Sequence, residues 1–428
     1  MVKPTLGFMS IASIAAIGAL AACGTSSTSS SSSGSGTKTC TGTVTVATEL
    51  PTSGADASDG MPTLQGAELA VAQANASHLL GGSCTVTEID KDDASVALGK
   101  HDPNQGAANM TALAGDAAVV GVVGPFNSSV CQAEMPIANQ ANLAEISPSC
   151  TNPGLTIPGS NSTINTLSLR PSGKITFFRV CATDIAQGSG LAQVAVSLGA
   201  KKAFVFDDQE TYGQGLAKTF SADFATDGGT VVGSASLPGT TRDFSSQLQS
   251  AKSKDADLIF FGGTSSNGGG ILRSQMAAAG LGSSVIFMGG DGIQDTEFTS
   301  DAGSAGNGAY STIAAPNVSQ LSSATQFVSD YQAKYNAAPG AYSANAYDAM
   351  NIILKAVQEA IAANGGTIPS NPQAFRESVR ANIASINYSG AIGQTSFDQN
   401  GDTKSGLLTL WQVQNGQWTW VKNVTVSS

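Results

Sequence analysis

The sequence predicts an α/β fold of two lobes, each built on a parallel-rich sheet flanked by helices. Three observations lead to this prediction. Short apolar segments alternate with segments of helical periodicity from residue 43 onward, which is typical of strand–helix–strand units. Polar loops follow the apolar segments, as they do at the carboxyl edge of a parallel sheet. The length of 428 residues exceeds that of one ordinary domain.

The alternation runs through two series. In the first, we expect strands at 43–47, 84–89, 117–123 and 143–146, with helices at 63–76 and 105–114. In the second, we expect strands at 177–180, 203–206, 231–237, 258–261 and 285–288, with helices between them. The rest of the chain predicts helices at 322–335, 343–363 and 373–384, then a β hairpin around Asn415-Gly416.

Two clusters of hydroxyl side chains follow neighbouring strands of the first series. Ser128 and Ser129 follow the strand at 117–123, and Ser147, Ser149 and Thr151 follow the strand at 143–146. Sequential parallel strands usually pair, so both clusters are expected at one carboxyl edge. Backbone N–H groups at a helix start, flanked by hydroxyls, suit a small anion such as a carboxylate. The alternative for Ser128 and Ser129 is capping of a helix without any ligand.

Polar residues also follow the strands of the second series, namely Tyr212, Thr264 and Asp291. The alternative for Asp291 is a turn residue between glycines. In the first series, Glu49 opens a loop that runs to about residue 62, and Asp90-Lys91-Asp92-Asp93 is interpreted as a solvated loop rather than a metal site.

The charge pattern and the missing motifs exclude several functions. The chain has 20 Lys and Arg against 31 Asp and Glu, and the basic residues are scattered, so we expect no nucleic-acid partner. G-x-S-x-G, C-x-x-C and the Walker A motif do not occur, and the two histidines, His78 and His101, fall in polar loops. We therefore expect no metal, no cofactor and no enzymatic activity.

Residues 1–22 are predicted to be a signal peptide. Lys3 precedes an apolar stretch at 6–20, which is too short to span a bilayer comfortably. The stretch ends in Leu20-Ala21-Ala22-Cys23, which resembles the lipobox of bacterial lipoproteins, where Cys23 becomes the lipidated first residue. Residues 23–39, rich in Ser and Gly, then form a flexible tether to the cell membrane of a bacterium. The alternative is an ordinary cleaved secretory signal followed by a chance cysteine.

Export permits disulfides among the five remaining cysteines. Cys40 precedes the first strand and Cys84 opens the second, so both are expected at the same amino edge. Cys131 and Cys150 flank the two hydroxyl clusters at the opposite edge. These pairings fit a parallel sheet and leave Cys181 unpaired, although sequence alone does not fix connectivity and some cysteines are small buried side chains in many proteins.

Six motifs in order behind the lipobox resemble the branched-chain amino-acid-binding proteins. These are solute-binding components of ABC importers and have the type I periplasmic-binding fold. The motifs are GPFNSS, ISPSCTNPGLT, FRVCATDIAQG, DDQETYGQGLA, FFGGT and FMGGDG. The resemblance extends from about residue 43 to the C-terminus.

The resemblance implies a role for each of six residues. Ser128 holds the carboxylate of the ligand, and Ser149 and Thr151 complete the amino-acid site. Tyr212 supplies an aromatic side chain, and Asp291 pairs with the ligand ammonium. Thr264 stands where leucine-type binders carry a tyrosine, and the first loop lacks a tryptophan that some members use. These two departures leave open an amide, urea or an aromatic acid as ligand, or a role as a ligand sensor.

The resemblance also implies three crossovers between lobes, near 181–184, 314–316 and 405–408. Lobe 1 then comprises 40–181 and 316–406, and lobe 2 comprises 182–315 and 407–428. The expected function is hinge closure on a small amino acid, branched-chain or related, which a monomeric receptor delivers to a membrane permease.

Overall fold

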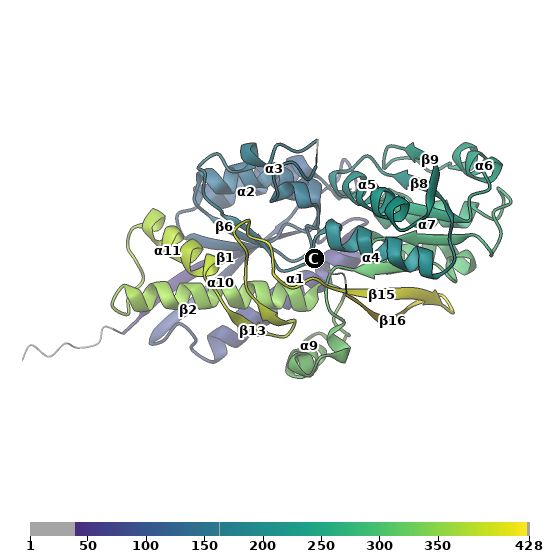
Figure 1. The fold of residues 1–428 in the computed structure, drawn as a ribbon. Helices are drawn as coiled ribbons and strands as arrows, with labels where there is room; N and C mark the ends of the chain where they lie inside the picture. Colours follow the sequence, from purple (N-terminus) through teal and green to yellow (C-terminus); the bar gives the residue numbers. More distant parts are fainter. Residues whose placement is uncertain (1–38, 162, 426–428) are drawn as a thin grey trace, which may run out of the picture. The chain divides into compact units, whose positions relative to one another are not determined.

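The computed structural model describes residues 39–161 and 163–425 (Figure 1). The predicted signal peptide, Cys23 and the predicted tether up to residue 38 lie outside the described residues. Within them, two parallel-rich sheets are each flanked by helices, so the predicted two-lobed α/β fold is confirmed. Among the described helices, none combines the length and the apolar character that crossing a membrane requires.

The first sheet consists of five parallel strands. In spatial order they are β2 (Ser83–Asp92), β1 (Thr41–Leu50), β5 (Val119–Val123), β6 (Ala144–Ser147) and β7 (Phe177–Arg179). Because β5 and β6 are parallel neighbours, the loops that follow them leave the sheet at the same edge.

Helices cover both faces of the first sheet (Figure 1). One face carries α2 (Pro103–Gly115) and α3 (Ser128–Gln140), and the other carries α1 (Ala57–Ala76), α10 (Ser343–Ala363) and α11 (Pro372–Ala384). Side chains alternate along β1 accordingly: Val46 packs with α1 and α10, whereas Ala47 packs with α2 and α3. The core of this lobe therefore forms from segments separated by about 300 positions in the sequence, near residues 46 and 350.

The second sheet has seven strands. In spatial order they are β16 (Gln417–Thr425), β15 (Leu407–Gln414), β12 (Tyr310–Ile313), β11 (Ile286–Gly289), β10 (Leu258–Gly262), β8 (Lys202–Asp207) and β9 (Thr230–Ser236). The contacts of β15 with β12 and β16 are antiparallel, and the others are parallel. The predicted hairpin turn at Asn415-Gly416 joins β15 to β16, and both residues have positive φ, as that turn requires.

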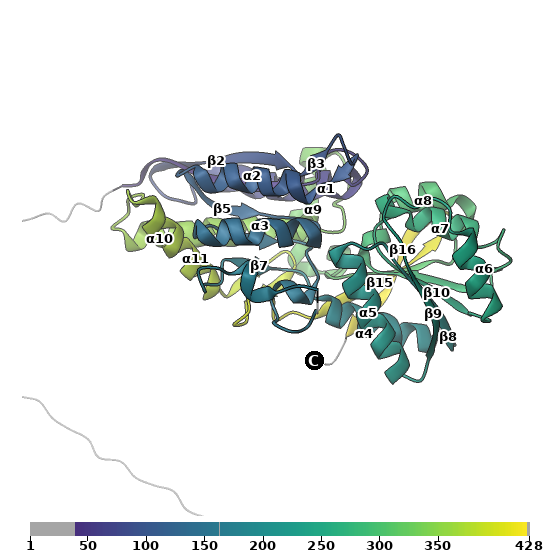
Figure 2. The same ribbon diagram turned by 90° about the horizontal axis from the view of Figure 1, so that it is seen from above.

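Helices also lie on both faces of the second sheet (Figure 2). They are α4 (Asp184–Ser197) and α5 (Thr211–Thr226) on one face, and α6 (Ser245–Ser253), α7 (Gly269–Gln275) and α8 (Thr296–Ala302) on the other. The central strand β10 is apolar throughout because it is buried on both faces: Phe260 stacks on Phe220 of α5, with ring centroids 3.8 Å apart, and Phe261 packs toward α7 and α8.

Four short strands and one further α-helix complete the strands and α-helices of the described residues. They are β3 (Ala94–Ser95), β4 (Lys100–His101), β13 (Tyr388–Gly390), β14 (Gly393–Thr395) and α9 (Thr325–Tyr335). The short strands pair as two antiparallel hairpins.

The structure corrects two predictions near the carboxyl edge of the first sheet. The loop predicted to run from Glu49 to residue 62 is mostly ordered structure, because β1 continues to Leu50 and α1 begins at Ala57. Pro62 lies inside α1, and its usual helix-breaking effect had placed the predicted start too late. Asp93, predicted to be solvated, is fully buried, and so is Glu49. Burial depends on which helix covers a loop, and residue type alone does not reveal it.

Two disulfides match the predicted pairings. Cys40 and Cys84 join the amino ends of β1 and β2, with Cα atoms 5.4 Å apart. Cys131 of α3 and Cys150 join the two loops at the opposite edge, with Cα atoms 6.7 Å apart. Cys181 is buried and has no disulfide partner among the described residues.

The first disulfide is expected to stabilise the fold chiefly by lowering the conformational entropy of the unfolded chain. It closes a loop of 44 residues, for which chain entropy predicts about 4 kcal/mol. Replacing both Cys40 and Cys84 by Ala should therefore lower the free energy of unfolding by about that amount, measured by urea denaturation. The Cys131–Cys150 pair, with a separation of 19, should cost about 3 kcal/mol when removed in the same way. A larger loss for the shorter loop would contradict the entropic explanation.

Candidate functional site

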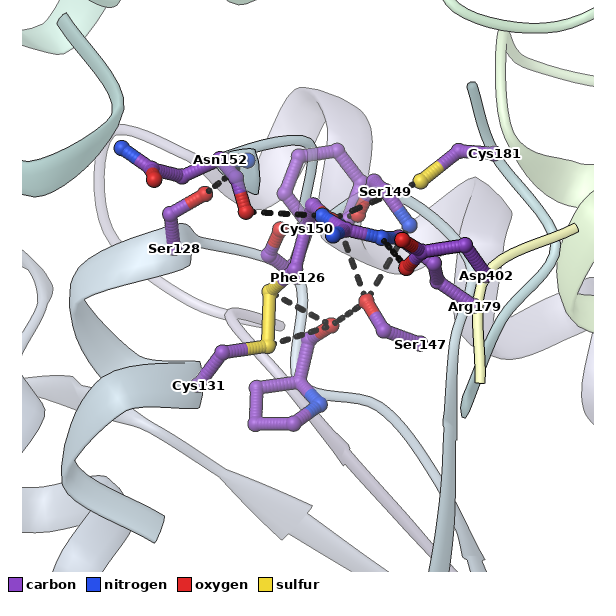
Figure 3. Close-up of a disulfide and its surroundings, with 11 residues drawn as sticks. Phe126, Ser128, Cys131, Ser147, Ser149, Cys150, Asn152, Arg179, Cys181 and Asp402 are labelled. Carbon is purple, nitrogen blue, oxygen red and sulfur yellow. Dashed lines mark hydrogen bonds and ion pairs between the residues drawn. A yellow bond between two sulfur atoms is a disulfide. The ribbon is translucent and has the colours of Figure 1, made fainter. Parts of the chain in front are cut away.

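The carboxyl edge of the first sheet holds three of the predicted ligand residues. Ser128 begins α3 after β5, and Ser149 and Thr151 follow β6. Two hydrogen bonds connect the loops that carry them: Ser149 Oγ donates to Phe126 O at 2.8 Å, and Asn152 N donates to Ser128 Oγ at 3.3 Å (Figure 3). The structure therefore brings the two predicted hydroxyl clusters together.

The capping alternative for these serines is wrong in this structure. The N-cap residue of α3 is Asn127, and its side chain makes no capping hydrogen bond within the described chain. Ser128 instead accepts from the backbone of the neighbouring loop. Ser147, the last residue of β6, donates to Pro125 O at 2.6 Å.

Thr151, in the loop after β6, contacts the start of α4. Asp184 N donates to Thr151 O at 2.9 Å. Thr151 Oγ1 and Asp184 Oδ2 are both buried and have no hydrogen-bond partner among the described residues. Burial raises the pKa of Asp184 to about 7, and the nearby Asp291 carboxylate adds to the shift. The Thr151 hydroxyl and the Asp184 carboxyl group thus lie close together, and the other oxygen of Asp184, Oδ1, accepts from Gln187 Nε2 at 3.1 Å.

Arg179, at the end of β7, fixes the loop that carries Thr151 (Figure 3). Its Nη1 donates to the carbonyl oxygens of Cys150 and Asn152, both at 2.8 Å, and its Nη2 donates to Thr156 Oγ1. Its Nε donates to Asp402 Oδ1 at 2.7 Å. The side chain is fully buried. Sequence reasoning missed this residue, although it stands in the FRVCATDIAQG motif, because the interaction partners are far apart in the sequence.

Asp291 and Tyr212 come together at the carboxyl edge of the second sheet. Asp291 follows β11, and Tyr212 lies in the first turn of α5. Tyr212 OH and Gln187 Nε2 donate to Asp291 Oδ1 at 2.8 and 2.7 Å, and Tyr342 OH donates to Asp291 Oδ2 at 2.7 Å. Burial raises the pKa of Asp291, while these three donors act to lower it. All three donors are neutral, so within the described residues no cation balances the charge of this carboxylate.

Gln187 and Tyr342 were not predicted as site residues. Gln187 donates to both Asp184 Oδ1, at 3.1 Å, and Asp291 Oδ1, and so links the two acids. The signal for Gln187 was its place in the FRVCATDIAQG motif, and Tyr342 directly precedes the helical segment at 343–363. Neither position has a local pattern that distinguishes a site residue from an ordinary polar or aromatic one.

Thr264 lies next to this group without sharing its hydrogen bonds. Its Oγ1 and Ser266 Oγ are 2.9 Å apart, and its N donates to Asp208 Oδ2 at 3.3 Å. A Cβ placed on Gly292 would lie 3.2 Å from Thr264 Cγ2 and 2.8 Å from Tyr212 Cε1, so the three residues are close neighbours. The small threonine side chain leaves more room here than a tyrosine would.

Several hydrogen bonds connect the loops of the first sheet to those of the second. Asn152 Nδ2 donates to Thr211 O at 2.6 Å, and Thr211 Oγ1 donates to Gln132 Oε1 at 2.9 Å. Lys100 Nζ lies 3.1 Å from Glu210 Oε1 and 2.5 Å from Asn267 Oδ1. Polar groups at the two carboxyl edges thus contact each other directly.

A cavity of about 460 Å³ has in its lining Gln294, three residues after Asp291, and Ala341, which directly precedes Tyr342. Its lining includes Asp59 of α1, Asp295 before α8, and the indole rings of Trp411 and Trp418. Among the described residues that line the cavity, there is none of the six predicted ligand residues and no Lys, Arg or His. Burial and the neighbouring Asp295 raise the pKa of Asp59 well above its usual range. The cavity wall is therefore acidic and aromatic.

The family of this chain follows from its similarity to known proteins. A family model described as periplasmic binding protein matches residues 43–417. The chain belongs to the periplasmic binding protein family. It is accordingly an extracytoplasmic solute-binding protein and not an enzyme. The resemblance inferred from the sequence motifs is confirmed.

Individual relatives cover nearly the whole family region. The chain is similar to the Leu/Ile/Val-binding protein homolog 3 of Brucella melitensis, with 27% identity over 380 residues, covering 87% of this chain and 92% of that protein. Among solved structures it is similar to the leucine-binding protein LivK of Thermotoga maritima, with 26% identity, a TM-score of 0.75 and coverage of 89% and 98%. It is also similar to the branched-chain amino-acid transporter protein LivJ of Streptococcus pneumoniae in complex with isoleucine, with 26% identity, a TM-score of 0.74 and coverage of 90% and 99%.

The buried Arg179–Asp402 pair predicts a large effect of a single substitution. Arg179→Gln would leave Asp402 buried without its cation, which should lower the free energy of unfolding by about 3–5 kcal/mol. Lys174→Gln is the matched control, because it breaks an ion pair of similar length, 2.8 Å, whose side chains are 49% and 39% exposed. The control should change stability by less than about 1 kcal/mol. Equal small losses in urea denaturation would show that Arg179 does not hold this loop.

Proposed function

We propose that this periplasmic binding protein is the receptor of an ABC importer and binds a small amino acid, branched-chain or related, between its two lobes. Lobe 1 comprises residues 40–181 and 316–406, and lobe 2 comprises 182–315 and 407–428. Closure about the three crossovers delivers the bound ligand to a membrane permease, and the receptor acts as a monomer. Cys23 carries the lipid anchor, and the tether leads from it to the folded part.

The observation that carries the proposal is the environment of Asp291. Its carboxylate is held by the neutral donors of Tyr212, Gln187 and Tyr342, with no cation among the described residues. A ligand ammonium is the group that such a site lacks. A charged hydrogen bond in a desolvated site is stronger than a neutral one, so an ammonium can replace one of these donors with a net gain.

The ligand carboxylate is assigned to the opposite edge. Ser128, Ser149 and Thr151 lie on the two loops that meet there, and the first turn of α3 adds backbone N–H groups. The buried hydroxyl of Thr151, which lies beside Asp184, can donate to the ligand carboxylate. Tyr212 then forms a wall of the site, and Thr264 leaves room for the side chain of the ligand.

Ligand-driven closure follows from this division of the site. The carboxylate contacts belong to lobe 1 and the ammonium contact to lobe 2, so a ligand that holds both groups favours the closed form through contacts that an open form cannot make. The names of the relatives, which refer to leucine, isoleucine and valine, support a branched aliphatic side chain for the ligand.

The role of Asp291 is tested by Asp291→Asn. Loss of the charge should weaken amino-acid binding by about 2–5 kcal/mol, measured by isothermal titration calorimetry with L-leucine or with the amino acid that binds best. Asp227→Asn, the same chemical change on an exposed residue of lobe 2, should leave affinity unchanged. The melting temperature of the ligand-free variant separates loss of binding from loss of folding. Unchanged affinity in a folded Asp291→Asn protein would overturn the ammonium role.

The class of ligand is tested by a thermal-shift screen with amino acids, amides, urea and aromatic acids. A ligand at a hundredfold excess over its Kd stabilises the folded state by about 2.7 kcal/mol, which raises the melting temperature measurably. We expect a rise with one or a few small α-amino acids. A response confined to amides, urea or aromatic acids would replace the amino-acid assignment by that class and would leave the family unchanged.

A further inference from the structure

Four carboxyl groups lie together in the interior of the first lobe. They belong to Glu49 on β1, Asp93 just after β2, Glu134 on α3 and Glu145 on β6. Each of these residues is 0% exposed. The group lies in the layer between the first sheet and the helices α2 and α3, which Figure 1 shows on one face of that sheet.

The alternation of the strands places these side chains on the same face. Ala47, two residues before Glu49, packs against α2 and α3, whereas the neighbours of Glu145, Ala144 and Ile146, face α1 and α10. Glu49 and Glu145 therefore both point toward α3. A Cβ on Gly106 of α2 would lie 2.6 Å from Glu134 Oε1, so the helix approaches the group closely.

Among the described residues, seven of the eight carboxylate oxygens in this group accept no hydrogen bond from an N–H or O–H group if all four side chains are ionised. The eighth, Glu49 Oε1, accepts from Asn109 Nδ2 of α2 at 2.9 Å. None of the four residues forms an ion pair within the described chain. The nearby charged groups are Asp92 and Asp56, and the imidazole of His101 is engaged by Asp56 at 2.7 Å.

Four unpaired negative charges in such a site would cost far more than the fold can supply. A bound metal ion does not neutralise these charges, because the described residues contain no group of three acidic, His or Cys side chains arranged to hold one. Protonation of the carboxyl groups does. A neutral carboxyl has an O–H donor, so protonated members can donate to the oxygens of their neighbours and satisfy them.

We propose that these four carboxyl groups form a proton-holding centre that keeps the ligand edge of lobe 1 ordered in acidic surroundings and loosens it as the medium becomes alkaline. The centre is built on the segments that carry the proposed ligand residues. Glu134 lies on the same helix as Ser128, and Glu145 lies four residues before Ser149. The inference concerns folding and does not depend on which ligand binds.

The direction of the pH effect follows from the shifted groups. Burial raises the pKa of Glu49 to about 7, and burial together with the neighbouring acids raises the pKa of Asp93, Glu134 and Glu145 well above the usual range. In the unfolded chain these groups titrate near 3.8 or 4.5. The stabilisation is therefore complete below about pH 4 and is lost as the pH rises through 7 and beyond.

Asp56 does not interfere with this measurement. Burial would raise its pKa, but the interaction with His101 outweighs burial and lowers the pKa to about 2. Its contribution to stability is lost only as the pH falls below about 4. A range from about pH 5 to pH 8 thus excludes Asp56 from the measurement. Other acids with a raised pKa, such as Glu88 and Asp348, contribute to the slope in this range, so single variants are needed to identify the contribution of the four groups.

The test is urea denaturation of the full chain across this range. Each proton held only by the folded protein multiplies the unfolding equilibrium constant by about ten per pH unit, so two such groups should give about a hundredfold rise per unit and further groups a steeper one. Glu134→Gln and Glu145→Gln keep the shape and remove one titrating proton each, so each should reduce the slope by about one factor of ten per pH unit. Glu359→Gln, the same change at an exposed residue of α10, is the control and should keep the wild-type slope.

A spectroscopic measurement on the folded wild type avoids dependence on how well the variants fold. The infrared carbonyl band of protonated carboxyl groups should persist at pH 7 and should lose intensity in either variant but not in the control. Stability that does not fall between pH 5 and pH 8 would overturn the proposal. So would variants with the slope of the control, or a wild-type protein without that band at pH 7.

Discussion

The guanidinium of Arg179 ties the ligand side of the first lobe to a distant part of the chain. It donates to two carbonyl groups of the loop after β6 and to Asp402, which lies more than 200 positions later in the sequence. The loop from Cys150 to Thr156 has no strand or α-helix of its own, so its shape depends on these bonds and on the disulfide from Cys131. Arginine suits this task because its planar donors serve several acceptors at once.

Neutral donors hold Asp291 of the second lobe, whereas a cation holds Asp402 of the first lobe. Tyr212, Gln187 and Tyr342 surround Asp291 and leave its charge uncompensated within the described residues. If an arginine neutralised this carboxylate, a ligand ammonium would add little binding energy. The contrast between Asp402, paired with Arg179, and Asp291, held by hydroxyl and amide groups, separates a structural acid from one that remains available for binding.

Scarcity of basic side chains shapes the rest of the molecule. With 20 Lys and Arg against 31 Asp and Glu, the chain cannot pair every acid with a cation, and several of the acids without one are buried. Glu88 and Asp348 are further examples, because burial raises the pKa of each, to about 8 and about 7. An interior of this kind keeps its acids neutral by holding protons, which couples the stability of the fold to the acidity of the medium.

The sequence alone determined the fold class, most strands and helices, and the family, because these depend on local periodicity and on motifs of a few residues. Helix α10 was predicted with its observed bounds, Ser343–Ala363, since its apolar spacing is regular over 21 residues. Helix α8 was not predicted, because only Phe298 and Ala302 of its seven residues are buried, and two positions do not define a period. The tertiary structure alone decided that Glu49 and Asp93 are buried, that Arg179 binds Asp402, and that Tyr342 reaches Asp291. Each of these facts depends on segments that are distant in sequence and adjacent in space, which no local pattern encodes.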